Sequence, residues 1–384
     1  MRKVLLLGAS GNIGTQALDI LERDPTSFSL IAISVGKHIE KIPQILSRFA
    51  SISFLCVQNE DDAKKLEKEY PSLKIYFDDE GLISLIRESN ADMVVNALVG
   101  FAGLMPSITA LEENKILCLA NKESLVVGGE KIKRLLARGK GKLYPIDSEH
   151  VALAKCLSKV NRSDVDKLII TASGGSFRKL SRNELEDVTP EMALKHPTWS
   201  MGEKITIDSA TMFNKGFEVI EAYYLFNWPI DRIEVLMHDE SYVHSALLMK
   251  DGTYYADVCK PDMHGPIEYA LYEGKNDFTI YHEKKLSDFG RYTFHKFKKE
   301  RYPAVGIALS ALKEGGIKTA ILNAADEEAV YLFLEGKIPF LSIEKIVSRS
   351  LAHFPNIEHP TLRDIRSMDF YTRLYVKRTF GGEN

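Results

Sequence analysis

The first 147 residues alternate short apolar runs with segments of helical periodicity, and this alternation limits the folds open to the chain. Apolar runs of this length suit strands buried on both faces, and the segments between them suit covering helices. Strands alternating with helices predict βαβ units in an open parallel sheet, with ligands beyond the carboxyl ends of the strands. The expected strands are Val4–Leu7, Leu30–Val35, Ile52–Val57, Asp92–Leu98, Ile116–Ala120 and Lys142–Ile146, and the helices include Asp61–Tyr70, Glu80–Ser89 and Ser124–Arg138.

A glycine-rich loop follows the first expected strand and opens a helix. Glycines allow a tight turn there, and the N–H groups of a helix N-terminus suit a pyrophosphate. The spacing is G-x-x-G-x-x-G rather than the stricter G-x-G-x-x-G, so an ordinary turn between strand and helix stays open as an alternative. The predicted dinucleotide-binding residues are Gly8, Ala9, Ser10, Gly11, Asn12, Ile13 and Gly14.

The end of the second expected strand indicates which dinucleotide binds. NAD sites usually carry an acidic residue there for the ribose 2′-hydroxyl. This chain has Ser34, Val35, Gly36, Lys37 and His38, and the next acid is Glu40. A lysine and a hydroxyl would hold a 2′-phosphate that a carboxylate would repel. The sequence therefore predicts NADP(H) rather than NAD(H).

The regular alternation of expected strands and helices ends after residue 147. Residues 148–275 mix expected strands with helices and predict an α+β catalytic domain, in which the irregular stretch 173–201 suits a flexible lid. Residues 276–298 are polar and suggest a linker. Residues 299–384 return to helical periodicity and predict a small C-terminal α-helical bundle. The expected strands here are Lys167–Thr171, Lys204–Asp208, Ile233–His238, Val243–Met249 and Thr253–Cys259, and the helices are Ala304–Lys313, Lys318–Leu334, Ser342–Phe354 and Thr361–Phe380.

Two groups of acids are candidate metal ligands. Asp147 and Glu149 end the last strand of the first domain, and side chains at i and i+2 of an extended segment face the same way. Ser209 suits a helix N-cap, and from there residues 214 and 218 share one face at i, i+4. An all-oxygen site of Asp147, Glu149 and Glu218 would favour Mg²⁺ or Mn²⁺ over zinc. Solvated surface acids are the alternative.

Three further polar segments follow expected strands or stand in loop-like surroundings. Asn121–Glu123 is either a capped helix start or a lysine aimed at a substrate. Ser173–Gly175 is either a common turn or an anion cradle. His196–Gly202 places one of only two tryptophans, Trp199, in a polar context, where a core anchor is the alternative to a lid.

Composition excludes several classes of protein. Fifty basic residues against 53 acidic ones give a net charge of −3, which argues against nucleic acid as a main partner. The most apolar stretch, Met93–Met105, is too short to span a membrane. The first residues resemble a signal peptide, but the apolar run ends after four residues, so a strand is expected. Four scattered cysteines fit reduced thiols in the cytoplasm.

Several of these segments together resemble the 1-deoxy-D-xylulose 5-phosphate reductoisomerase family. The resemblance is collinear over essentially the whole chain, and two long motifs, His196–Gly202 and Asp208–Glu218, are specific to it. The other matching segments are Gly8–Gly14, Gly36–Lys37, Asn121–Glu123, Ile146–His150, Ser173–Gly175, Pro261–Met263 and Leu322–Ala325. Ser176 departs from the family, which often has Pro or Ala there.

The resemblance implies a role for each matching position. It implies metal ligation by Asp147, Glu149 and Glu218, and a substrate-phosphate site at Ser173, Ser209, Asn214 and Lys215 with His196 close by. It implies that Ser148 contacts substrate hydroxyls, that Lys122 lies near the reacting carbon, and that Glu149 and His196 take part in catalysis. His196 to Met201, with Trp199, corresponds to the substrate flap. The NADPH site corresponds to Gly8–Gly14, Gly36, Lys37, His38, Asn121, Glu123 and Gly202.

The chemistry that the resemblance implies has two stages in the non-mevalonate isoprenoid pathway. A 2-ketose phosphate chelated to Mg²⁺ or Mn²⁺ rearranges by retro-aldol cleavage and re-addition. NADPH then reduces the resulting aldehyde. The family also implies a homodimer. A metal-independent NADP-dependent dehydrogenase and a non-enzymatic NADP(H)-sensing regulator remain alternatives.

Overall fold

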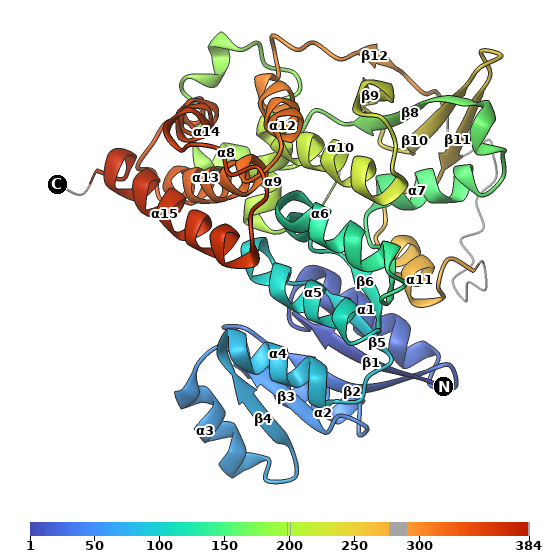
Figure 1. The fold of residues 1–384 in the computed structure, drawn as a ribbon, viewed down its shortest axis with the longest axis vertical. Coiled ribbons are helices and arrows are strands. Elements are labelled where there is room, and N and C mark those ends of the chain that lie inside the picture. Colours follow the sequence, from blue (N-terminus) through green and yellow to red (C-terminus); the bar gives the residue numbers. More distant parts are fainter. Residues whose placement is uncertain (198, 200, 276–289, 383–384) are drawn as a thin grey trace. The chain divides into compact units, whose positions relative to one another are not determined.

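The computed structural model describes residues 1–197, 199, 201–275 and 290–382, which form two compact units (Figure 1). Of the described residues, unit 1 contains 1–124, 130–151 and 262–275. Unit 2 contains 125–129, 152–261 and 290–382. In the described part of the chain no helix is long and apolar enough to span a membrane.

Unit 1 is built on a seven-stranded sheet in which every pairing is parallel, as the alternation of strands and helices predicted. Its order is β4-β3-β2-β1-β5-β6-β7. The chain reverses its direction of progress between β1 and β5, and an open α/β sheet binds its ligand at such a point. The strands are β1 Arg2–Leu7, β2 Phe28–Ser34, β3 Phe54–Val57, β4 Lys74–Phe77, β5 Met93–Asn96, β6 Ile116–Leu119 and β7 Lys142–Pro145.

The central strands of this sheet are buried along most of their length, because helices supply apolar side chains against them. Every residue of β5 and β6 is buried, and the core includes Leu6, Leu18 and Ile33 at 1% exposure or less. The helices are α1 Asn12–Arg23, α2 Ile42–Arg48, α3 Glu60–Glu69, α4 Asp78–Glu88, α5 Leu104–Glu112, α6 Lys122–Ala137 and α11 His264–Leu271, with 3₁₀ turns Ile39–Lys41 and Gly100–Gly103.

Unit 2 contains a five-stranded sheet of order β11-β10-β8-β9-β12. The β8–β9 pairing is parallel, and the other pairings are antiparallel. The strands are β8 Val165–Ala172, β9 Ile233–Met237, β10 Val243–Met249, β11 Tyr254–Val258 and β12 His295–Lys296. The expected linker 276–298 therefore ends in a short strand, and its residues 276–289 lie outside the described residues.

The C-terminal helices share one core with helices from the middle of the chain. Phe213 and Phe217 of the middle region lie in the same buried cluster as Phe333 and Val347. The helices are α7 Ser148–Leu157, α8 Pro190–Ala193, α9 Glu203–Thr211, α10 Phe213–Phe226, α12 Pro303–Glu314, α13 Lys318–Leu334, α14 Ser342–His353 and α15 Leu362–Phe380, with 3₁₀ turns Arg162–Asp164, Asn183–Leu185 and Ile230–Arg232. The expected boundaries at 147, 275 and 298 thus do not coincide with the edges of the compact units.

Two predictions of secondary structure are wrong. The segment 204–208, expected as a strand, is part of helix α9, since its alternation of polar and apolar residues also fits a helix buried on most sides. The residues Asp147 and Glu149 are not in one extended segment. Strand β7 ends at Pro145, and α7 begins at Ser148.

Candidate functional site

The glycine loop joins β1 to α1 beside the end of β5. Gly8 has φ +81°, and a Cβ built on it would lie 2.7 Å from the carbonyl oxygen of Ala97, directly after β5. A Cβ on Gly14 would lie 2.2 Å from the carbonyl oxygen of Gly8. Both positions therefore need glycine, one for its conformation and both for the space. The strand-to-helix placement is the context in which such a loop binds a pyrophosphate.

Ser34 fixes the start of this loop. Its Oγ accepts a hydrogen bond from the backbone N–H of Gly8 at 2.9 Å, and its carbonyl oxygen accepts one from Ala9 at 2.9 Å. Gly11 occupies the N-cap position of α1 and, as a glycine, has no side chain with which to cap that helix end.

The residues that follow β2 lie on the surface. Gly36, Lys37 and His38 are exposed, and Nδ1 of His38 lies 3.0 Å from Oε1 of Glu40. Lys41, which sequence reasoning missed, donates from Nζ to the carbonyl oxygen of Ser10 at 3.0 Å. In the sequence, Lys41 is marked only by its position four residues after Lys37.

Asn121 organises the carboxyl end of β6. Its Oδ1 accepts a hydrogen bond from the backbone N–H of Ser124 at 3.0 Å, so it caps α6, which was one of the two alternatives for this segment. Its Nδ2 donates to the carbonyl oxygens of Leu98 and Gly100 at 2.9 Å and to Oε2 of Glu123 at 3.1 Å. The segment at 121–123 is thus tied to the loop after β5.

The next residue, Lys122, lies on Asp147. Their Nζ and Oδ2 atoms are 2.7 Å apart, with the two side chains only 10% and 15% exposed. Asp147 also accepts from the backbone N–H groups of Glu149 and His150 at 3.1 Å, so it acts as the N-cap of α7. A carboxylate that caps a helix and pairs with lysine is held in a single orientation.

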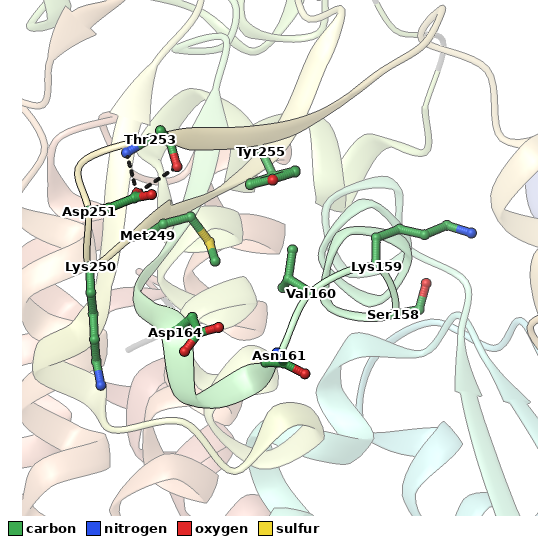
Figure 2. Close-up of a pocket in the computed structure, with 10 residues that line it drawn as sticks. All are labelled: Ser158, Lys159, Val160, Asn161, Asp164, Met249, Lys250, Asp251, Thr253 and Tyr255. Carbon is green, nitrogen blue, oxygen red and sulfur yellow. Dashed lines mark hydrogen bonds between the residues drawn. The ribbon is translucent and has the colours of Figure 1, made fainter.

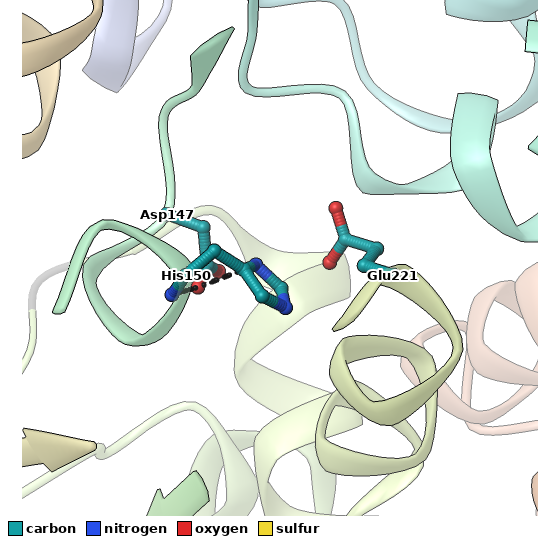
Figure 3. Close-up of side chains that lie close together, drawn as sticks. All are labelled: Asp147, His150 and Glu221. Carbon is teal, nitrogen blue, oxygen red and sulfur yellow. Dashed lines mark hydrogen bonds and ion pairs between the residues drawn. The ribbon is translucent and has the colours of Figure 1, made fainter. Parts of the chain in front are cut away.

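His150 also lies against Asp147. Its Nδ1 lies 3.0 Å from Oδ1 of Asp147, and its side chain is fully buried (Figure 3). Burial alone would raise the pKa of Asp147, but the charges of Lys122 and His150 outweigh it and hold the pKa well below its usual range. The next side chains along the chain, Ser148 and Glu149, are 2.5 Å apart through Oγ and Oε2.

In unit 2, the loop after β8 lies against α9. Gly174 and Gly175 both have positive φ, and a Cβ on Gly175 would be 2.5 Å from the carbonyl oxygen of Ser209. Oγ of Ser173 accepts from the backbone N–H of Gly175 at 3.4 Å. The structure thereby brings the two predicted serine-bearing segments together. Ser209 lies within α9 and is not an N-cap, so that expectation is wrong.

Asn214, Lys215 and Glu218 form a connected group on α10. Nδ2 of Asn214 donates to Oε1 of Glu218 at 2.6 Å, which confirms the predicted shared face. Nζ of Lys215 pairs with Oε2 of Glu218, and both side chains are at most 5% exposed. Helix α10 follows Met212, whose left-handed backbone (φ +73°) separates it from α9. Glu221, also buried, lies one turn further along α10.

The segment before α9 contains the predicted flap. The backbone N–H of Trp199 donates to Nδ1 of His196 at 2.9 Å, and the Trp199 ring lies 6.1 Å from the ring of His244. Burial, with a further contribution from Arg178, lowers the pKa of His196 to about 4. Met201 is half-buried, and Gly202 is the N-cap of α9. Thr198 and Ser200 lie outside the described residues.

The earlier part of the expected lid belongs to the core of unit 2. Phe177, Leu185 and Ala193 are buried in the main cluster, and Oγ of Ser176 donates to the carbonyl oxygen of Ala193 at 2.6 Å. Thr189 caps α8 through its side chain. The described contacts therefore leave the stretch after Ala193 as the part of the segment that suits a flap.

A separate surface pocket contains none of the predicted residues. It has a volume of about 650 Å³ and lies where β10 turns into β11, beside the end of α7 (Figure 2). Its charged lining includes Lys159, Lys250 and Asp164, and Asp251 is tied to Thr253 by two hydrogen bonds. Nothing in this lining corresponds to the glycine loop or to the acid groups.

The predicted residues thus form one set in each unit. Unit 1 carries a glycine loop for a dinucleotide and a carboxylate pair supported by lysine and histidine. Unit 2 carries serines, an amide and a lysine suited to an anion, together with a buried carboxylate and the flap. Carboxylate oxygens are the ligands that Mg²⁺ and Mn²⁺ prefer, and the described set offers no thiolate beside them.

Comparisons with known proteins identify the family of the chain. Family models match residues 4–129 as 1-deoxy-D-xylulose 5-phosphate reductoisomerase, residues 143–226 as the C-terminal domain of that enzyme, and residues 258–375 as the DXP reductoisomerase C-terminal domain. The chain is 44% identical over 379 residues to a protein of that name from Geobacillus sp. (strain WCH70), covering 98% of this chain and 99% of the relative.

Solved structures give the same result. The reductoisomerase from Zymomonas mobilis in complex with NADPH is 34% identical, with a TM-score of 0.90 and full coverage of both chains. A DOX-P reductoisomerase in complex with NADPH, fosmidomycin and magnesium is 31% identical, with a TM-score of 0.93 over 99% of this chain and 98% of that chain. These similarities extend over all the motifs described above, and the chain belongs to the 1-deoxy-D-xylulose 5-phosphate reductoisomerase family.

Proposed function

We propose that this chain converts 1-deoxy-D-xylulose 5-phosphate to 2-C-methyl-D-erythritol 4-phosphate, using NADPH and a divalent cation, in the non-mevalonate isoprenoid pathway. The observation that carries the proposal is the presence of every expected functional side chain in a chain that matches the family from end to end. A metal-independent dehydrogenase would need no buried carboxylate paired with lysine in each unit.

Asp147, Glu149 and Glu218 are the proposed ligands of Mg²⁺ or Mn²⁺. The support is that all three residues are carboxylates, whose oxygens are the ligands that these cations prefer, and that Glu218 is buried and Asp147 only 15% exposed. The bound cation would act as a Lewis acid toward the substrate's ketone and adjacent hydroxyl. Lys122 would stabilise negative charge that develops on substrate oxygen, and Ser148 would bind a substrate hydroxyl.

Ser173, Ser209, Asn214 and Lys215 are the proposed binding groups for the substrate phosphate. Hydroxyl and amide donors with one buried ammonium suit a phosphate dianion. Binding energy from this remote group would fix the orientation of the reacting end of the substrate. The contact between the Gly175 loop and Ser209 supports the assignment, since it holds two of the four segments together.

The flap residues His196, Trp199 and Met201 are proposed to close over the bound substrate. Closure would exclude water and retain the aldehyde and any fragments until reduction. Because the low pKa of His196 keeps its ring neutral at pH 7, the ring can donate from Nε2 while Nδ1 accepts from Trp199. His196 is thereby suited to donate a hydrogen bond to a phosphate oxygen.

Gly8 to Gly14, with Gly36, Lys37, His38, Asn121, Glu123 and Gly202, are the proposed contacts of NADPH, which supplies the hydride. The pyrophosphate would lie on the N-terminus of α1, where the N-cap residue is a glycine without a side chain. Lys37 is exposed after β2, and an exposed ammonium at that place favours a 2′-phosphate.

A homodimer in the cytoplasm is the proposed state of the protein. The edge strand β11 exposes Tyr254, Tyr255 and Val258 at 64%, 49% and 38%. Large apolar side chains on an exposed strand edge favour association with a partner. Sedimentation velocity of the wild-type protein and of Tyr254→Lys tests this, since a monomeric wild type would contradict it.

The decisive experiment for the function is NADPH consumption with 1-deoxy-D-xylulose 5-phosphate, with and without divalent cation. We expect oxidation with Mg²⁺ or Mn²⁺ and none after treatment with EDTA. Activity that survives EDTA would favour the metal-independent dehydrogenase. No turnover of any sugar phosphate in the presence of Mn²⁺ would favour the non-enzymatic NADP(H)-sensing regulator.

Two variants separate the metal site from the fold. Glu149→Gln should lower turnover about a hundredfold through weaker metal binding while NADPH affinity is retained. Glu130→Gln, at an exposed position of α6, is the matched control.

Trp199→Ala should lower turnover through poor flap closure, and unchanged kinetics would exclude a flap role for Trp199.

A further inference from the structure

A buried lysine connects three helices of unit 2. Lys204 of α9 has its Nζ 2.5 Å from Oδ2 of Asp208 and 3.1 Å from Oδ2 of Asp326 on α13. The same Nζ lies 5.0 Å from the ring centroid of Phe217 on α10. The three charged side chains are at most 5% exposed. Lys204 therefore contacts its own helix, α10 and α13 at one point.

Burying such a network costs desolvation free energy. A buried charge requires a partner, and removing one member of a buried pair is strongly destabilising. Burial raises the pKa of Asp326, against the opposing effect of Lys204. An apolar trio would fill the same space more cheaply. A polar trio restricts the helices to one arrangement, because ion pairs depend on direction and distance more steeply than apolar contacts do.

The helices that the network joins carry the proposed phosphate ligands. Asp208 directly precedes Ser209, whose carbonyl oxygen faces Gly175. Across the break at Met212, Oγ1 of Thr211 donates to the carbonyl oxygen of Asp208 at 3.2 Å and accepts from the N–H of Phe213 at 3.3 Å. The start of α10, with Asn214 and Lys215, is thus connected to the end of α9.

Phe217 provides the second connection. It is 1% exposed and lies on α10 between Lys215 and Glu218. A cation over its ring restricts how α10 can rotate about its own axis. Through Asp326 and Lys204, helix α13 is therefore linked to both α9 and α10, the helices that supply the proposed phosphate ligands.

We propose that Asp326, acting through Lys204, is a positioning residue for phosphate binding, which holds Ser209, Asn214 and Lys215 in the arrangement that receives a phosphate. The inference rests on the proposed function for the identity of the substrate. It adds a residue on α13 that has no direct part in the proposed chemistry. Positioning residues of this kind determine affinity, since small displacements of binding groups are costly.

The test compares Asp326→Asn with Asp369→Asn. Asp369 is also a buried aspartate with a pKa raised by burial, and it pairs with Arg373 on α15 at 2.8 Å. The two variants remove similar ion pairs from the same unit. The measurements are KM and kcat for 1-deoxy-D-xylulose 5-phosphate, the shift of Tm by inorganic phosphate, and NADPH affinity.

We expect Asp326→Asn to raise the KM about tenfold, to lower kcat less than threefold, and to reduce the phosphate-induced shift of Tm. NADPH affinity should be unchanged. Asp369→Asn should lower Tm in the absence of ligand and leave KM and the phosphate-induced shift as in the wild type. Equal KM values for the two variants, or a loss of kcat alone in Asp326→Asn, would overturn the proposal.

A second variant covers a failure of Asp326→Asn to fold. Lys204→Gln keeps a hydrogen-bond donor toward Asp326 but removes the charge through which Asp326 is proposed to act, so its KM should rise in the same sense. A wild-type KM in Lys204→Gln would then overturn the proposal. The phosphate arm needs no turnover. A wild type inactive on 1-deoxy-D-xylulose 5-phosphate would contradict the proposed function alone, while phosphate binding would still decide the positioning role.

Discussion

The imidazole of His196 accepts at Nδ1 the backbone N–H of Trp199, three residues further along the chain, at 2.9 Å. This bond requires a ring nitrogen without a proton. The lowered pKa of His196, about 4, is consistent with it, because burial and the charge of Arg178 both oppose protonation. The turn that carries Trp199 is therefore sensitive to acid.

The unfolded chain binds a proton at His196 with a pKa near the ordinary value of about 6.5. The folded chain binds it only near 4. The contribution of the neutral His196 ring to the free energy of unfolding is therefore fully present above about pH 6.5. It is lost as the pH falls from there toward 4. We expect His196→Gln to lose less Tm than the wild type between pH 7 and pH 5. His359→Gln, at an exposed position, should follow the wild type. An NMR titration that gives His196 an ordinary pKa would contradict this prediction.

Gly14→Ala should damage the glycine loop before any cofactor is present. The added Cβ would meet the backbone of Gly8 and Ala9 at 2.2 and 2.8 Å, and backbone cannot move aside cheaply. We expect Tm to fall by several degrees, as a loss of roughly 1–3 kcal/mol implies. Gly36→Ala is the control, since nothing lies within 4 Å of its Cβ. Equal Tm values for the two variants would exclude close packing as the reason for Gly14.

Lys122→Met should expose the dependence of Asp147 on its partner. With the ammonium gone, a largely buried carboxylate retains His150 and backbone donors only, and breaking such a pair costs about 3 kcal/mol. The depressed pKa of Asp147 stabilises the fold above the unfolded value, near 4, and this effect is lost as pH falls through the folded value. The variant should therefore unfold at a higher pH during acid titration. Lys140→Met, at an exposed position, should not.

Lys37→Asp tests the preference for NADPH. A carboxylate at this exposed position would repel a 2′-phosphate and accept a ribose hydroxyl. We expect the KM for NADPH to rise at least tenfold, which corresponds to about 1.4 kcal/mol, with a smaller change for NADH. Lys65→Asp introduces the same charge change at an exposed position on α3. An unchanged NADPH affinity in Lys37→Asp would refute the role of Lys37.

The fold of unit 1 was predictable because parallel strands are buried on both faces and appear as apolar runs. All six expected strands are present. The strand that was missed, β4, lies at the edge of the sheet with no residue fully buried, so it carries no such run. The helix at 203–211 was mistaken for a strand, since Lys204 and Asp208 are buried as an ion pair and pattern analysis assigns buried charges to the surface.

Sequence motifs identified the candidate residues, but they did not predict the local geometry of those residues. Asp147 and Glu149 were expected to face one way along a strand, whereas Asp147 caps a helix that begins at the next residue. A carboxylate at the end of a strand has the same sequence signature in either case. His150 was quoted within a motif but given no role, and its contact with Asp147 is visible only in three dimensions.

The left-handed residue Met212 has a consequence for the two helices that meet there. In one continuous α-helix, residues 209 and 214 would project about 140° apart, nearly to opposite sides of the rod. The reversal of backbone handedness at Met212 ends that rod and starts a new one, so the two side chains are released from this angular separation. In one straight helix, Ser209 and Asn214 would face different surroundings. With the break at Met212, both side chains can face the same bound ligand.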